Sequence, residues 1–149
     1  MYTSKIQIVA LLGLVLCAAS VNAADIEVTM LDKSETGGML TFEPSFVKAN
    51  VNDTIVFIPT YKGHNSSSLL VPDNAANWKG PFDKEFRVKL EKEGVYLYAC
   101  DAHKPMGMVG VVQVGEAVNL EEARKKAAET SAKMIMNKDR FTKALEQVK

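Results

Sequence analysis

Two histidines, one cysteine and one methionine carry the strongest chemical signal in this sequence. His103 follows Cys100 by three residues and Met108 follows it by eight, whereas His64 lies on a separate segment upstream. Together they offer two imidazoles, a thiolate and a thioether, and soft sulfur ligands combined with imidazole favour copper. Two histidines and a cysteine near one plane, with a distant axial methionine, form the ligand set of a blue-copper electron-transfer site.

The spacing of these residues has a structural reason. Cys100 ends one apolar run and Met108 begins the next, so the loop between them can turn three donors toward one ion. Pro105 and Gly107 favour a tight path for that loop. Anchoring the ion from a second, distant segment would hold its geometry fixed between oxidation states. Spacing alone does not exclude Met106 as the fourth ligand.

The N-terminus predicts a secretory signal over residues 1–23. A positive Lys5 precedes an apolar run, which ends at the small-x-small sequence Val21-Asn22-Ala23. Cleavage there removes Cys17 and leaves Cys100 as the single cysteine of the mature chain. Because a lone thiol in an oxidising compartment becomes oxidised or cross-linked, we expect a metal to cap it.

Length and charge narrow the function further. The 149 residues suffice for one domain with a core. Acidic and basic residues balance at 18 each, without a polybasic tail, which argues against a nucleic-acid partner. We expect no membrane partner after signal cleavage, and a monomer, which suits a mobile carrier.

Residues 24–115 predict an all-β domain that contains the metal site. Apolar residues alternate with polar ones in short runs separated by turn signals, which is typical of a sandwich or barrel. The expected strands begin near Ile26, Met39, Thr54, Ser67, Phe86, Val95 and Val109.

Residues 116–149 predict a helical extension packed on the same domain. Alanine, glutamate and lysine dominate this segment, and Asn119 with Glu122 forms a capping-box pattern. A second helix is expected to start near Asn137 or Asp139. The predicted buried faces comprise Leu120, Ala123 and Ala127 in the first helix, and Phe141, Ala144, Leu145 and Val148 in the second.

Several motifs resemble the cupredoxin family, specifically its members with a helical tail rather than the shorter plastocyanins. The motifs are Gly63-His64-Asn65, Tyr98-Ala99-Cys100-Asp101-Ala102-His103, Met106-Gly107-Met108, Phe42-Glu43-Pro44 and Phe57-Ile58-Pro59. The resemblance implies a Greek-key β-sandwich with two C-terminal α-helices. It also implies one copper ion held by His64, Cys100, His103 and Met108, with Met106 not a ligand. The backbone N–H of Asn65 is expected to bond the thiolate.

The resemblance further implies a function. It indicates a type 1 (blue) copper protein of the periplasm that cycles between Cu(II) and Cu(I). Its partners would be periplasmic redox proteins, namely a copper nitrite reductase or another denitrification enzyme, and cytochrome c. In the family, lysines around the exit histidine steer acidic partners. The lysines in question here are Lys62, Lys104, Lys33 and Lys79.

Other functions compete with electron transfer. A periplasmic copper chaperone or storage protein would use the same soft ligands but exchange the metal readily. A structural zinc site rarely takes methionine, so Met108 argues against it. A cysteine–histidine hydrolase lacks an oxyanion motif here, and two histidines are too few for a multicopper oxidase. We therefore expect that this protein is not an enzyme.

Overall fold

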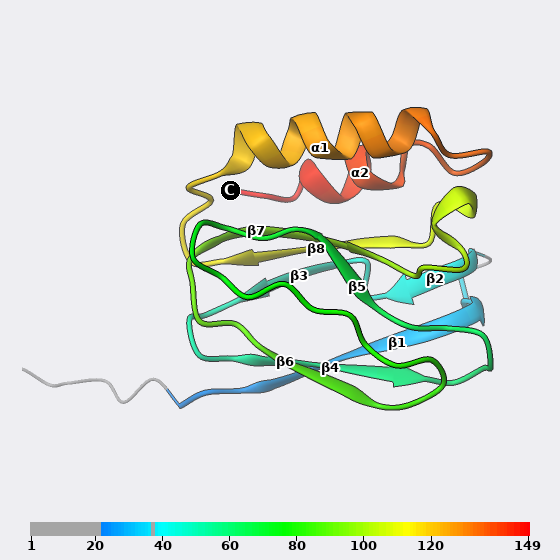
Figure 1. Cartoon of the computed structure of the whole chain (residues 1–149), viewed down its shortest axis with the longest axis horizontal. Helices are drawn as coiled ribbons and strands as arrows, with labels where there is room; N and C mark the ends of the chain where they lie inside the picture. The colour runs from blue at the N-terminus through cyan, green and yellow to red at the C-terminus, as the bar shows by residue number, and fades with distance from the viewer. Residues whose placement is uncertain (1–21, 37) are drawn as a thin grey trace, which may run out of the picture.

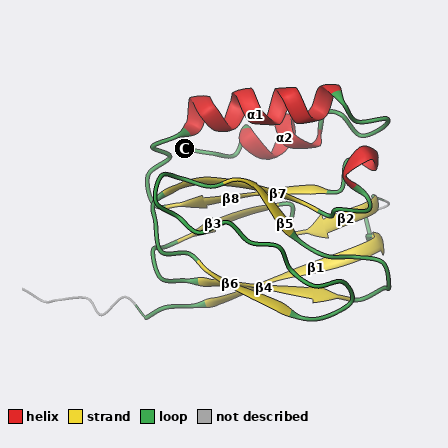
Figure 2. Ribbon diagram, in the orientation of Figure 1, coloured by secondary structure: helices red, strands yellow, loops and turns green. Residues whose placement is uncertain are grey.

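Two facing β-sheets and a pair of helices make up the part of the chain that the computed structural model describes, residues 22–36 and 38–149. One sheet has the order β2-β1-β4-β6 and the other the order β3-β8-β7-β5, and the helices lie over the outer face of the second sheet (Figures 1 and 2). The strands of the first sheet are β1 (Asp25–Lys33), β2 (Met39–Glu43), β4 (Thr54–Pro59) and β6 (Phe86–Lys89). Those of the second are β3 (Phe46–Ala49), β5 (Ser67–Leu70), β7 (Gly94–Ala99) and β8 (Val109–Val114).

The two central strands of the second sheet, β7 and β8, are buried on both faces, and this explains why almost all their residues are apolar. Tyr96, Tyr98 and Cys100 belong to the core between the sheets. The alternate residues Leu97 and Ala99 belong to the core beneath the helices. A strand covered on both sides has no solvent face to keep polar, so every residue of β7 is buried.

The helical extension forms as predicted, with α1 at Leu120–Ala132 and α2 at Arg140–Leu145. Its predicted apolar faces are confirmed, because Ala123, Ala127, Phe141, Ala144 and Leu145 are buried and Leu120 and Val148 pack against them. None of the described helices combines the length and apolar composition needed to cross a bilayer.

The predicted capping box at Asn119 is wrong. Asn119 precedes α1, but its side chain makes no bond to the helix. Its Oδ1 accepts from the backbone N–H of Val95 at 2.7 Å, and its Nδ2 donates to the carbonyl of Val95 at 3.0 Å. The side chain therefore fastens the start of α1 to β7, an attachment that the local pattern could not reveal.

One strand was not predicted from the sequence. β3 has only four residues and follows closely after Pro44, and it pairs in parallel with β8 from Phe46 opposite Val111 to Ala49 opposite Val114. A short strand whose partner lies far along the chain leaves a weak local signal. The predicted fold class is otherwise confirmed: an all-β sandwich with two C-terminal helices. The predicted signal segment lies almost wholly outside the described residues.

A buried aspartate joins the start of β1 to the turn before β4. Asp53 is 2% exposed. Its carboxylate accepts from the backbone N–H of Ala24 at 2.8 Å and from that of Asn50 at 2.7 Å. These two bonds hold the pKa of Asp53 below its ordinary value of 3.8, although burial opposes them.

Replacing Asp53 by alanine leaves these two N–H groups without their acceptor. We expect Asp53→Ala to lower the free energy of unfolding at neutral pH by about 2–3 kcal/mol. Because the folded pKa lies below the unfolded one, the part of this stabilisation that depends on ionisation is complete above the unfolded pKa. It is lost as the pH falls through the folded pKa.

Urea unfolding at neutral pH and at about pH 3 measures the effect, and the difference between wild type and variant should shrink at the acidic pH. Asp73→Ala, in an exposed loop, is the matched control. A difference that stays constant with pH would contradict the role of the ionised carboxylate.

Candidate metal centre

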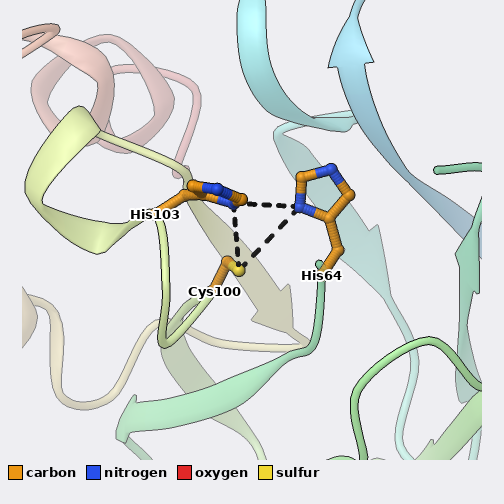
Figure 3. A group of neighbouring side chains, drawn as sticks. All are labelled: His64, Cys100 and His103. Carbon is orange, nitrogen blue, oxygen red and sulfur yellow. Dashed lines mark hydrogen bonds between the residues drawn. The ribbon is translucent and has the colours of Figure 1, made fainter. Parts of the chain in front are cut away.

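Three of the predicted ligands converge on one point at the edge of the sandwich. Cys100 directly follows β7, His103 lies in the loop toward β8, and His64 comes from the connection between β4 and β5 (Figure 3). The Sγ atom of Cys100 lies 4.0 Å from Nδ1 of His64 and 3.7 Å from Nδ1 of His103. The two Nδ1 atoms are 3.1 Å apart.

The size of this triangle fits a single transition-metal ion. A point in the plane of the three atoms lies about 2.1 Å from each of them, within the range of about 2.0–2.3 Å that imidazole and thiolate ligands keep from an ion such as zinc. Among the residues that the structure describes, these three form the group of histidine, cysteine and carboxylate side chains able to hold an ion. The donor set of two imidazoles and one thiolate suits copper.

The centre is almost closed to solvent. His64 and Cys100 have no exposed surface, whereas His103 is partly exposed. Burial, with a further contribution from nearby His64, lowers the pKa of His103 below its ordinary value. The lowered pKa favours the neutral imidazole of His103, whose lone pair can bind a metal.

Met108 is held against the other candidate ligands through its backbone. The N–H of Cys100 donates to the carbonyl of Met108 at 3.0 Å, and the N–H of Met108 donates to the carbonyl of His103 at 3.1 Å. The side chain of Met108 is fully buried in the same core as Cys100. The environment of Met106 is different, because Met106 lies in the 3-10 turn η1 (Lys104–Met106) and is partly exposed.

The orientation of His64 is set by Asp32, a residue that the sequence analysis missed. Nε2 of His64 lies 2.8 Å from Oδ1 of Asp32. An ionised carboxylate only accepts hydrogen bonds, so in the neutral imidazole Nε2 carries the hydrogen and Nδ1 keeps its lone pair. That lone pair faces Cys100 and His103, as metal binding requires.

A second unpredicted contact joins the two chain segments that carry the ligands. Oδ1 of Asn65 accepts from the backbone N–H of Asp101 at 2.8 Å, and its Nδ2 donates to Oδ2 of Asp101 at 2.9 Å. Burial raises the pKa of Asp101, but bonds from Asn65 and Ser67 and the charge of Lys79 outweigh it and lower the pKa overall. The expected bond from the Asn65 backbone to the sulfur is not recorded among the described residues, where Sγ instead contacts the carbonyl of Gly63 at 3.9 Å.

The C-terminal extension holds the outside of the ligand loop. Three successive carbonyls of this loop accept hydrogen bonds from the segment that leads into α2. The pairs are Ile135 N–H with Pro105 at 2.7 Å, Asn137 Nδ2 with Met106 at 2.9 Å, and Arg140 Nη1 with Gly107 at 2.9 Å. The connection between the helices and the first residue of α2 therefore restrain the loop that presents His103 and Met108.

Comparison with known proteins identifies the family. Residues 28–115 match the family model for copper binding proteins of the plastocyanin/azurin family. A putative pseudoazurin from Rhizobium leguminosarum bv. viciae is 43% identical over 117 residues, which span 76% of each chain. Pseudoazurin from Paracoccus pantotrophus is 40% identical over 115 residues, or 75% of this chain and 79% of the relative.

Solved structures agree with these relatives. The crystal structure of native pseudoazurin from Hyphomicrobium denitrificans matches with a TM-score of 0.76 and 37% identity, over 84% of this chain and 98% of that one. Pseudoazurin from Methylobacterium extorquens AM1 matches with a TM-score of 0.72 and 34% identity, over 84% and 99%. The chain therefore belongs to the copper-binding plastocyanin/azurin family and, within it, to the pseudoazurins, and its cofactor is copper.

Proposed function

We propose that this chain is a periplasmic type 1 copper electron carrier whose metal is held by His64, Cys100, His103 and Met108. The observation that carries the proposal is the convergence of three donor atoms on one metal-sized point, with buried Met108 fastened beside them. Bound copper supplies a one-electron couple, Cu(II)/Cu(I), and this is the chemistry that the site requires.

The surrounding residues suit electron transfer rather than catalysis. With four protein donors, no coordination position stays open for a substrate. The full burial of Cys100 keeps water and substrates from the thiolate. The contacts of Asn65 with Asp101 hold the two ligand segments in one arrangement, so a change of oxidation state moves them little.

Electrons would leave through His103, the candidate ligand that reaches the surface. Ala102 and Pro105 beside it are exposed. Ile135, bonded to the loop at Pro105, is 80% exposed, and its neighbour Met136 is 50% exposed. These side chains give a partner an apolar surface on which to dock close to the imidazole.

A copper chaperone or storage protein is the alternative function. Such a protein must release its metal, which is favoured by exposed and mobile ligands. Here His64, Cys100 and Met108 have no exposed surface, and the loop between the last two is restrained from outside by Asn137 and Arg140. These features favour a carrier that retains its copper.

Copper addition tests the central claim. We expect Cu(II) to produce an intense visible absorption band from thiolate-to-copper charge transfer, with one copper bound per chain. Cys100→Ser removes the thiolate and should abolish the band while the fold, followed by circular dichroism, persists. A colourless and rapidly exchanging wild-type copper protein would support the chaperone instead.

A pair of leucine variants tests the axial ligand. Leucine keeps the volume of methionine without its sulfur, so the core of either variant stays filled. We expect Met108→Leu to change the visible spectrum and raise the reduction potential, and Met106→Leu to leave both near wild type. The reverse pattern, measured by absorption and voltammetry, would assign the axial position to Met106.

The proposed partners are acidic periplasmic redox proteins, with a copper nitrite reductase or another denitrification enzyme as acceptor and cytochrome c as a further partner. Lys62 and Lys33 are exposed near the site, but Lys79 already pairs with Asp101 at 3.6 Å. Lys104 lines a hollow of about 290 Å³ beside Pro105, together with Lys126 of α1 and Lys133, which directly follows α1. These two lysines extend the basic surface and were not predicted from the sequence. We also propose that the protein is a monomer, which suits a mobile electron carrier.

Export would follow cleavage after residue 23, leaving a β-sandwich over 24–115 and its helical extension over 116–149. The backbone N–H of Ala24 already donates to Oδ1 of Asp53 at 2.8 Å. Cleavage would place a charged α-amino group there, beside a buried carboxylate.

Electrostatic steering predicts a salt-dependent reaction with the acidic partner. We expect the second-order rate of electron transfer to nitrite reductase to fall about tenfold or more as ionic strength rises from about 0.01 to about 0.5 M. Lys104→Ala and Lys133→Ala should lower the rate at low salt several-fold. Lys92→Ala, exposed in the turn before β7 and so at the opposite end of that strand from Cys100, is the control. Stopped-flow rates that do not vary with salt would rule out steering.

A further inference from the structure

We propose that Asp32 sets the reduction potential of the copper site through its negative charge, an inference that rests on the copper site proposed above. Asp32 lies in β1, in the sheet opposite to β7, the strand that Cys100 directly follows. Its carboxylate reaches the buried ring of His64, with Nε2 and Oδ1 2.8 Å apart. Asp32 therefore places a negative charge in hydrogen-bond contact with a candidate copper ligand.

The charge of Asp32 is not neutralised by a basic side chain. Across residues 22–36 and 38–149, His64 is its recorded ion-pair and hydrogen-bond partner, and no lysine or arginine pairs with it. Other surface carboxylates do form ion pairs with basic side chains: Asp25 pairs with Arg87, and Asp139 pairs with Lys143. The carboxylate thus acts mainly on the imidazole in front of it.

Electrostatics gives the direction of the effect. Losing an electron raises the charge of the centre, and a nearby negative charge stabilises the higher charge state. The hydrogen bond also makes the imidazole a more basic ligand, which acts in the same direction. Asp32 therefore lowers the reduction potential. Its side chain is 48% exposed, so solvent screens part of the charge and the effect is modest.

A competing explanation is purely structural, in which Asp32 only selects the ring tautomer of His64. Asparagine separates the two roles, because its Oδ1 accepts the same hydrogen bond without a charge. Glutamate keeps the charge on a longer side chain. Leucine removes the charge and the bond together.

Voltammetry of the copper-loaded variants tests the proposal. We expect Asp32→Asn to keep the visible band and to raise the potential, with a shift of up to tenfold in the electron-exchange equilibrium, or about 59 mV for a one-electron couple. Asp32→Glu should stay close to wild type. Asp73→Asn makes the same charge change in an exposed loop away from the sheet and should leave the potential unchanged.

Two results would overturn the proposal. One is an Asp32→Asn potential equal to that of wild type or shifted no more than that of Asp73→Asn. The other is an equal shift in Asp32→Asn and Asp32→Glu, which would assign the effect to geometry.

A measurement without copper keeps this test separate from the proposed function. Nitrogen NMR of the metal-free protein should find the hydrogen of His64 on Nε2 in wild type and in Asp32→Asn, and distributed over both nitrogens in Asp32→Leu. A mixed tautomer in Asp32→Asn would assign any change in potential to ring geometry and so overturn the role of charge. Absence of a visible band in wild type, with the tautomers as expected, would count against the copper function alone.

Discussion

The side chain of Asn65 holds together the two segments from which the metal centre is built. Asn65 follows His64 directly, and Asp101 follows Cys100 directly. The amide of Asn65 accepts from the backbone of Asp101 and donates to its carboxylate, and it also donates to the carbonyl of Gly80. Because Asn65 is fully buried, losing these partners would leave several polar groups unpaired in the interior. The Asn65 side chain therefore helps to fix the distance between the thiolate and the His64 imidazole.

The architecture supports this centre from a second direction. β7 and β8 are buried on both faces, so the hairpin that carries Cys100 and Met108 is held between two cores. The connection between the two helices supplies Asn137, and α2 supplies Arg140; both donate hydrogen bonds to carbonyls of the ligand loop. Arg140 further donates to the carbonyl of Leu40 at 2.6 Å and so links the loop to β2. The helical extension thus contributes to the site as well as to the core.

What could be predicted from the sequence depended on whether the signal was local. The ligand loop from Cys100 to Met108 has its three donors within nine positions, so it could be recognised in the sequence. The alternation of apolar and polar residues in the strands is also a local pattern, and most strands could be predicted from it. The partner of Asn119 is Val95 and that of His64 is Asp32, each paired only by the folded topology. Contacts of this kind leave no periodic trace in a single sequence. β3 was missed because its four residues, close after Pro44, are too few to show a clear alternation.

The two histidines have opposite environments, and this asymmetry divides their roles. His64 is fully buried and has its outer nitrogen bonded to Asp32, so its electronic properties are governed by the protein. His103 is partly exposed, and within the described parts of the chain its recorded side-chain partners are Cys100 and His64, both through Nδ1. Its Nε2 edge thus stays available to a docking partner. The residue in contact with the buried imidazole and the exposed edge of the other imidazole therefore belong to different parts of the site, so the first can be varied without changing the second.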